Sequence, residues 1–178
     1  MEETKATPEG YSEEKVLEQM KYLSDIVEGK VSLQDIAGLS DRDINAILVM
    51  GSMMYEQGRY RQAEDLFRGA VLLNKNNPLA HSGLGTVLTA SGKNDEALTA
   101  LSEAIRLDDT DIASYVNRGE IHLKNANFPA ASEDFRKAVE LDPEAKDPGA
   151  NRARAIVVGM SQLVAELEKR IEEKGEGA

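Results

Sequence analysis

The sequence predicts an all-α fold made of three tandem helix hairpins of 34 residues each. Identical residues recur at a constant spacing of 34, with no insertion across three copies. Apolar residues within each copy follow the period of a helix, and no segment alternates with the two-residue period of a strand. We expect the repeats at residues 44–77, 78–111 and 112–145, between an N-terminal helical extension and a single capping helix.

Four columns of identical residues define the repeat. The columns are Gly51, Gly85 and Gly119; Ala63, Ala97 and Ala131; Ala70, Ala104 and Ala138; and Leu73, Leu107 and Leu141. A fifth column holds the large apolar residues Phe67, Leu101 and Phe135. A glycine inside a helix costs about 1 kcal/mol relative to alanine, so its recurrence indicates a packing need. We therefore expect Gly51 to face Ala63 across the hairpin, where the two backbones approach closely.

Each repeat contains two predicted helices. Those of the first two repeats are expected at about 43–57, 61–73, 78–91 and 95–107. Gly58 is expected to end the first of these helices in the left-handed conformation that glycine adopts without strain. In the third repeat, Pro129 falls in the first turn of the second helix, where its missing backbone donor is not needed.

Residues 12–43 are predicted to form the helical extension that precedes the repeats. Ser12 is expected to cap an amphipathic helix, and Ser40 to cap the first repeat helix. The apolar stripe of the amphipathic helix consists of Val16, Met20, Leu23 and Val27. Such a helix either folds back onto the array or pairs with a second copy of the chain, and periodicity does not decide between them. The stripe is therefore also the predicted dimerisation surface, and residues 1–11 before it are a predicted disordered tail.

The segment at residues 146–174 is predicted to be a C-terminal capping helix. An array of repeats needs a cap because its last unit otherwise exposes a stacking face. Apolar residues recur along the segment at helical spacing, with charged residues on the opposite side. This stripe consists of Ile156, Met160, Leu163, Leu167 and Ile171. Residues 175–178 are a predicted disordered tail.

The composition limits the partners that the chain is expected to bind. Its formal charge of -11 disfavours nucleic acids and anionic membranes, which are bound through lysine and arginine. The first residues are acidic and polar, unlike a signal peptide, and no apolar run approaches the ~18 residues that span a bilayer. Cysteine is absent, which removes disulfides and thiolate chemistry. We expect a cytoplasmic protein without membrane insertion.

The sequence offers no convincing catalytic or metal-binding constellation. The two histidines, His81 and His122, fall inside predicted helices at positions that favour packing between helices. Neither has acidic residues at the spacing of a metal site. The glycines of 83–85 lie inside a helix and lack the strand–turn–helix setting of a phosphate loop. We therefore predict a binding protein without a cofactor, and not an enzyme.

The period and the pattern of small and large residues resemble the tetratricopeptide repeat. That family places a glycine or alanine, two alanines and an aromatic residue at the positions matched here, except that Leu101 replaces the aromatic. Arg118 occupies a site that is normally apolar, and Ala126 replaces the glycine between helices. The resemblance implies a right-handed superhelix whose concave groove is formed by the first helix of each repeat.

The resemblance also implies which residues face that groove. The predicted groove residues are Leu48, Ser52, Tyr55, Ser82, Gly83, Thr86, Val116, Asn117, Glu120 and Leu123. They are mostly small or apolar, which suits an extended peptide with apolar anchors. The alternative is that Leu48 and Leu123 only pack against the terminal helices.

The residues at the groove positions argue against one known use of such grooves. Repeats that clamp the C-terminal carboxylates of Hsp70 and Hsp90 carry cations at positions that here hold Leu48, Ser52, Gly83, Ala113 and Asn117. A bound carboxylate would have no charged partner there, so this use is rejected.

The chain resembles the class II chaperones of type III secretion in three respects. These are the helix before the repeats, the single helix after them and the amino-acid sequence of the first two repeats. The resemblance implies that Leu48, Ser52 and Tyr55 line a pocket for a segment of a hydrophobic translocator, with Ser52 a departure from the large residue usual there. It also implies dimerisation through the N-terminal helix. The predicted function is a secretion chaperone; the alternative is a scaffold that assembles several proteins.

Overall fold

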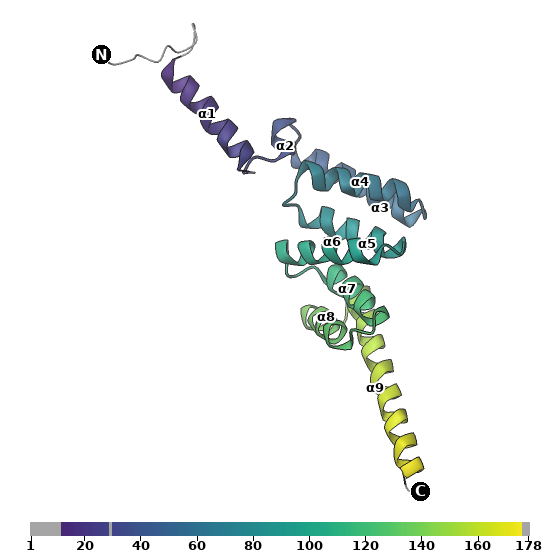
Figure 1. The fold of residues 1–178 in the computed structure, drawn as a ribbon. Helices are drawn as coiled ribbons and strands as arrows, with labels where there is room; N and C mark the ends of the chain where they lie inside the picture. The colour runs from purple at the N-terminus through teal and green to yellow at the C-terminus, as the bar shows by residue number, and fades with distance from the viewer. Residues whose placement is uncertain (1–11, 29, 176–178) are drawn as a thin grey trace, which may run out of the picture.

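A computed structural model describes residues 12–28 and 30–175 of the 178-residue chain. The described residues form nine α-helices and no strand, which confirms the all-α prediction (Figure 1). The helices are α1 (Glu13–Val27), α2 (Leu33–Ile36), α3 (Asp41–Glu56), α4 (Tyr60–Leu73), α5 (Pro78–Ala90), α6 (Asn94–Leu107), α7 (Ile112–Lys124), α8 (Phe128–Leu141) and α9 (Pro148–Gly175). The tail predicted at 1–11 lies outside the described residues, as do residues 176–178 of the tail predicted at 175–178. Gly175 belongs to α9, which corrects the start of that second tail.

The repeats form three hairpins, α3–α4, α5–α6 and α7–α8, each packed on the next. Local signals set their ends: the Ser40 hydroxyl accepts from the Asp43 backbone N–H, and the Asp43 carboxylate accepts from that of Ser40. Gly58 has φ +72°, as predicted, and Gly92 has φ +74°, so the first helix of each of the first two repeats ends in a left-handed glycine. Pro129 lies in the first turn of α8, as expected.

The left-handed position between α7 and α8 is held by Ala126, with φ 56°. A side chain in this conformation is strained by about 1–2 kcal/mol because its Cβ crowds the following carbonyl oxygen. We expect Ala126→Gly to raise the free energy of unfolding by about 1 kcal/mol in urea denaturation. Gly58→Ala is the matched control and should lower the free energy of unfolding by a similar amount. Unchanged stability in both variants would contradict this strain.

The repeated glycines make room for large side chains. A Cβ on Gly51 would lie 2.9 Å from Phe67 Cζ, and one on Gly119 would lie 2.7 Å from the Phe135 ring. The three atoms nearest to the missing Cβ of Gly51 all belong to the Phe67 ring, a contact that the sequence reasoning did not predict. Each hairpin is therefore closed by a large side chain of its second helix lying against a glycine of its first.

The core lies between the helices in two clusters. The first is formed mainly by α3 to α6 around Phe67 and Leu101, and the second joins α7, α8 and α9 around Phe135. The largest buried side chains in them are those of Phe67, Phe135 and Tyr115, and the chain contains no tryptophan.

The N-terminal helix α1 makes no packing contact with another helix among the described residues, and it stands away from the array (Figure 1). Its cap, Ser12, accepts from the Lys15 backbone N–H, as predicted. Met20 and Leu23 are 65% and 59% exposed, whereas the side chains of Val16 and Val27 lie outside the described ones. The fold-back alternative is thus not the arrangement seen.

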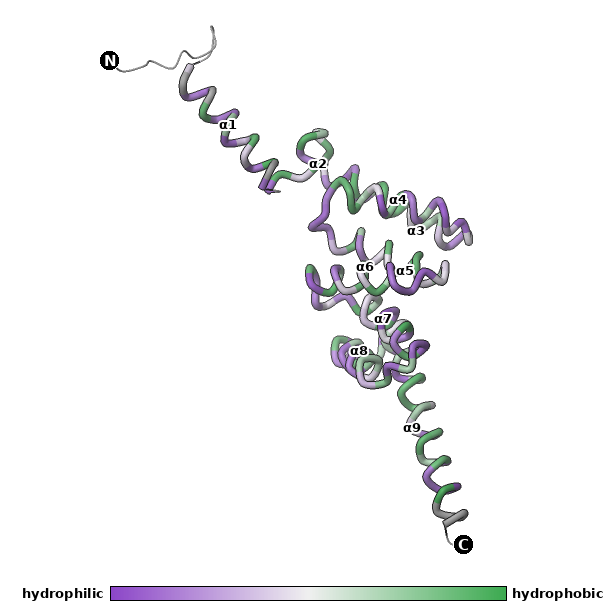
Figure 2. The backbone as a smooth tube through the Cα atoms, viewed as in Figure 1, coloured by the Kyte–Doolittle hydropathy of each residue, from purple (hydrophilic) through white to green (hydrophobic). Residues whose placement is uncertain are grey.

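The C-terminal helix α9 caps the array with its first turns. Ala150 and Ala153 are fully buried, and Ile156 packs on the same cluster with α7 and α8. The rest of the helix projects beyond the array (Figure 2). Its large apolar side chains are exposed. Leu163, Leu167 and Ile171 are 60%, 47% and 70% exposed, so this part of the predicted stripe caps nothing.

Candidate peptide-binding site

The first helix of the array contributes three of the predicted groove residues. Leu48 is 7% exposed and belongs to the core, so little of it can reach a ligand. Ser52 is exposed, and its hydroxyl donates to the Leu48 carbonyl at 3.1 Å. Tyr55 is half-buried, with its ring centroid 5.6 Å from that of Tyr60. Of the three, Ser52 and Tyr55 remain available at the surface of α3.

The middle helix α5 contributes residues that are joined to α7. The Ser114 hydroxyl donates to that of Ser82 at 3.2 Å, and the Asn117 amide donates to the Thr86 hydroxyl at 2.9 Å. Gly83, in contrast, faces the previous hairpin: a Cβ there would lie 2.2 Å from Phe67 Cε1. Gly83 therefore serves the contact between the first two repeats.

The third helix α7 is partly covered by α9. Val116 is fully buried beneath it, near Gly149, and is not accessible in this structure. Glu120 forms an ion pair of 2.6 Å with Arg152, whose guanidinium also donates to the Asn117 amide oxygen at 3.4 Å. Arg152 was not predicted, because the sequence does not reveal where α9 docks. Leu123 is half-buried against the second core cluster.

Gly83 aside, six of the ten predicted residues thus keep an exposed or half-buried position, and together with the buried Ser82 beside them we call them the groove strip. The groove strip consists of Ser52, Tyr55, Ser82, Thr86, Asn117, Glu120 and Leu123. Its middle is polar and internally hydrogen-bonded, and its one carboxylate is neutralised by Arg152. Such a strip can form hydrogen bonds with an extended peptide backbone. It presents no surface of unpaired charges of one sign to the peptide.

Exposed apolar side chains of α3, missed by the sequence reasoning, continue the surface. Val49, Met50 and Met53 are 60%, 53% and 50% exposed. The residues one repeat after Met50 and Met53 are Leu84 and Val87, which are buried against the preceding hairpin. The first repeat has no preceding hairpin, so the stacking face of α3 remains open. The repeat alignment contained this signal.

Charged groups in the core are paired. Arg118 donates to both carboxylate oxygens of Asp134, at 2.7 and 3.0 Å, and Asp134 is 3% exposed. The Asp134 carboxylate raises the pKa of Arg118, and burial raises the pKa of the neighbouring Tyr115. His122 Nε2 lies 4.0 Å from Asp134, and His81 Nε2 lies 2.9 Å from the Lys75 carbonyl oxygen. His122 thus lies in a contact between α7 and α8, whereas His81 bonds to the loop that joins α4 to α5.

Within residues 12–28 and 30–175, no three His, Asp or Glu side chains lie together in a way that could hold a metal ion. No helix in that part of the chain has the length and apolarity needed to cross a membrane.

Curated relatives match a little more than half of this chain and are much longer proteins. Mouse (Mus musculus) DnaJ homolog subfamily C member 7 is 28% identical over 101 residues, which are 57% of this chain and 20% of that protein. Human (Homo sapiens) DnaJ homolog subfamily C member 3 is 30% identical over 101 residues, again 57% of this chain and 20% of that protein. The chain thus spans about a fifth of the length of these relatives.

Solved structures match over more of the chain. The type III secretion translocator chaperone SycD of Yersinia enterocolitica is 19% identical, with a TM-score of 0.63 over 72% of this chain and 98% of that one. PcrH of Pseudomonas aeruginosa, bound to the chaperone-binding region of PopD, is 23% identical, with a TM-score of 0.63 over 70% and 96%. A type III secretion complex from Aeromonas hydrophila is 18% identical, with a TM-score of 0.68 over 84% and 98%. At these identities the likeness establishes the fold.

Family models settle what the repeats are. Two models described as tetratricopeptide repeat match residues 54–117 and 112–145, and together they span just over half of the chain. The hairpins, the glycine–aromatic contacts and the stacking described above agree with this match. The chain therefore belongs to the tetratricopeptide-repeat family.

Proposed function

We propose that the chain is a chaperone that holds an extended, apolar segment of a type III secretion translocator on its groove strip. The observation that carries this proposal is the strip itself, with accessible Ser52 and Tyr55 at one end and a neutralised Glu120 at the other. The open apolar face of α3, with Val49 and Met53, extends the surface that a hydrophobic client can cover. Burial of such a segment would keep it from aggregating before export.

The structural neighbours support this choice of client. PcrH has been solved with the chaperone-binding regions of PopB and PopD, and SycD is a translocator chaperone. A translocator must be apolar enough to enter a membrane, but it must stay soluble before export. An acidic carrier protein keeps such a client soluble until then, and no chemical reaction is needed. We place the complex in the cytoplasm and assign the chain no enzymatic activity and no cofactor.

We also propose that the apolar stripe of α1, formed by Val16, Met20, Leu23 and Val27, pairs two copies of the chain. Met20 and Leu23 are more than half exposed, and α1 has no partner helix within its own described chain. Burying such side chains against a second copy stabilises an amphipathic helix that is too short to be stable alone.

We expect co-expression with a translocator to yield a soluble complex of fixed stoichiometry. Ser52→Arg should weaken the complex by at least about tenfold, because a bulky charge then stands where the client backbone lies. Ser52 is exposed and bonds only to its own helix, so the fold should be preserved. Binding is measured by titration calorimetry, and light scattering of the free chain reports the dimer.

The matched control is Gln62→Arg, which introduces the same side chain at an exposed site on α4. It should bind as the unmodified chain does. Equal affinities of the Ser52→Arg and Gln62→Arg variants would contradict the groove assignment.

A scaffold is the second candidate, and the projecting half of α9 favours it. Val157, Met160, Val164, Leu167 and Ile171 follow the alternating spacing of three and four residues that is typical of a coiled coil. Three of them, Val164, Leu167 and Ile171, are 53%, 47% and 70% exposed. A complex that survives Ser52→Arg but is lost when α9 is cut after its first turns would favour the scaffold.

A further inference from the structure

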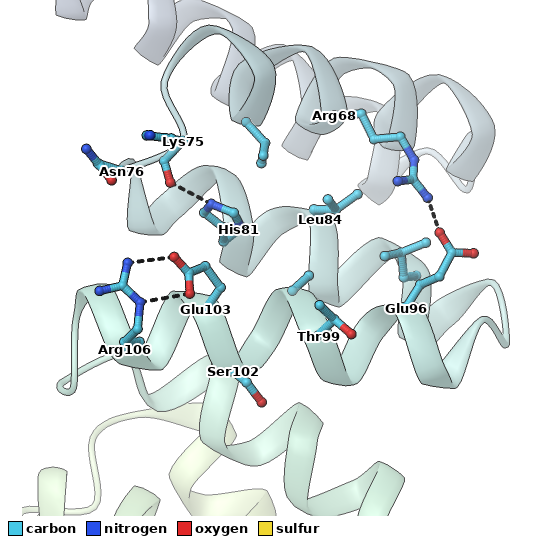
Figure 3. A pocket seen from close by; sticks show the side chains of 13 residues that line it. Arg68, Lys75, Asn76, His81, Leu84, Glu96, Thr99, Ser102, Glu103 and Arg106 are labelled. Carbon is cyan, nitrogen blue, oxygen red and sulfur yellow. Dashed lines mark hydrogen bonds and ion pairs between the residues drawn. The ribbon is translucent and has the colours of Figure 1, made fainter. Parts of the chain in front are cut away.

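A cavity of about 1080 Å³ opens between the second helices of the first two repeats, α4 and α6 (Figure 3). We call it the α4/α6 cavity. Its floor is apolar and is formed by Val71, Leu84, Leu88 and Ala100. Its rim carries Arg68 and Glu96 at one end, and Lys75, His81, Glu103 and Arg106 at the other (Figure 3). The groove strip contributes nothing to the lining, so the cavity is a separate feature.

In the third repeat the corresponding space is smaller, a pocket of about 350 Å³. The residues 34 positions after His81, Leu84 and Ala100 are Tyr115, Arg118 and Asp134. Tyr115 is 8% exposed, and the Arg118 guanidinium carbon lies 5.8 Å from its ring centroid while pairing with Asp134. An aromatic ring and an ion pair thus take up much of this space in the third repeat, where about 350 Å³ remains against about 1080 Å³ in the second.

The second repeat lacks all three of these groups. An imidazole replaces the phenol ring, and a leucine and an alanine replace the ion pair. The His81 ring is held at the rim by a hydrogen bond of 2.9 Å between Nε2 and the Lys75 carbonyl oxygen. In the second repeat, therefore, no phenol ring covers the apolar floor as Tyr115 does in the third repeat.

The rim adds a charge preference at one end. Arg68 is paired with Glu64 and Glu96, and the Arg106 guanidinium donates to both oxygens of Glu103, at 2.6 and 2.8 Å. Lys75 is exposed and pairs with no carboxylate among the described residues. In a chain with a net charge of -11, this end of the cavity offers an uncompensated cation beside an apolar floor.

We propose that the α4/α6 cavity binds a partner polypeptide through one aromatic side chain, with an acidic residue next to it in the partner's sequence. The ring would take the place that Tyr115 occupies in the third repeat, and the carboxylate would pair with Lys75. An aromatic side chain that is buried in a pocket is a common anchor of protein interfaces, because it removes a large apolar area from water.

The cavity and the groove strip lie on different sides of α5. At 3.6 residues per turn, Leu84 and Leu88 lie roughly opposite Ser82 and Thr86 on the helix. A partner bound at the cavity would therefore leave the groove strip accessible. The proposal is independent of the chaperone function, and the two can fail separately.

The test uses a five-residue peptide with a central tryptophan flanked by aspartates. The chain contains no tryptophan, so the emission of the peptide reports its transfer into an apolar site directly. We expect a saturable blue shift with the full chain. His81→Tyr, which installs the residue of the third repeat, should weaken binding at least tenfold, and Lys75→Gln should weaken it severalfold. A peptide with lysines in place of the aspartates should bind more weakly than the acidic one.

Two controls keep the outcome interpretable. His81→Tyr should unfold at no lower urea concentration than the unmodified chain, so a loss of binding would not reflect a loss of fold. Ser52→Arg, in the groove strip, should bind the peptide unchanged. The proposal is overturned if the acidic peptide shows no saturable shift, or if His81→Tyr binds it as well as the unmodified chain does. Equal binding of the acidic and basic peptides would overturn the role of Lys75.

Discussion

Gly83→Ala is expected to lower the free energy of unfolding by up to about 3 kcal/mol, although alanine is the better helix former. The added Cβ would lie 2.2 Å from Phe67 Cε1 and 2.6 Å from two further ring atoms. The ring cannot move away freely, because its other contact is Gly51, where a Cβ would already lie 2.9 Å from Cζ. Urea denaturation followed by far-ultraviolet circular dichroism measures the change.

The matched control for this prediction is Gly69→Ala. Gly69 also lies inside a helix, α4, but a Cβ there would meet no atom within 4 Å. Gly69→Ala should therefore raise the free energy of unfolding by about 0.5–1 kcal/mol through helix propensity alone. The two glycine-to-alanine changes are expected to have opposite signs. If Gly83→Ala proved as stable as Gly69→Ala, the Phe67 ring could not be packed so tightly against Gly83 that it excludes a Cβ.

Asp134→Ala is expected to cost about 3 kcal/mol, because it leaves the Arg118 guanidinium largely buried without its carboxylate. The Arg118 side chain is 22% exposed and that of Asp134 is 5% exposed, so solvent replaces little of the lost partner. The same urea titration measures the loss. Arg136→Ala breaks an exposed pair with Glu140 and should cost less than about 1 kcal/mol.

The double variant Arg118→Leu with Asp134→Ala should recover most of that loss. It transfers to the third repeat the residues that the second repeat has at the same positions, Leu84 and Ala100. Replacing both members of a buried ion pair by apolar groups is often neutral, since neither charge is then left in the core. A double variant no more stable than Asp134→Ala would mean that Arg118 stabilises the fold by contacts other than this pair.

The parts of the fold that depend on neighbouring residues were predicted from the sequence. Gly58 and Ser40 act within one turn of their own helix ends, so local patterns place them correctly. The period of 34 placed the hairpins because every unit repeats the same contacts.

The parts that were not predicted depend on docking between distant elements. Gly83 was assigned to the groove because its position in the repeat faces that way, but a bulky Phe67 in the preceding hairpin draws it into a packing contact. Val116 was assigned there too, and is covered because α9 lies over α7. Arg152 reaches the groove strip for the same reason. The roles of Ser52 and Tyr55 in binding stay predictions.

The position of Phe67 has a consequence for how the array unfolds. In many repeat proteins the terminal unit frays first, since each unit is coupled to its neighbour by a modest interface. Here one ring contacts a glycine in its own hairpin and another in the next, so opening the first hairpin also leaves a void against α5. Amide protons of α3 and α5 should therefore exchange in one concerted event. The first two repeats would melt as a single cooperative unit, which keeps the surface offered by Ser52 and Tyr55 intact until the whole unit is lost.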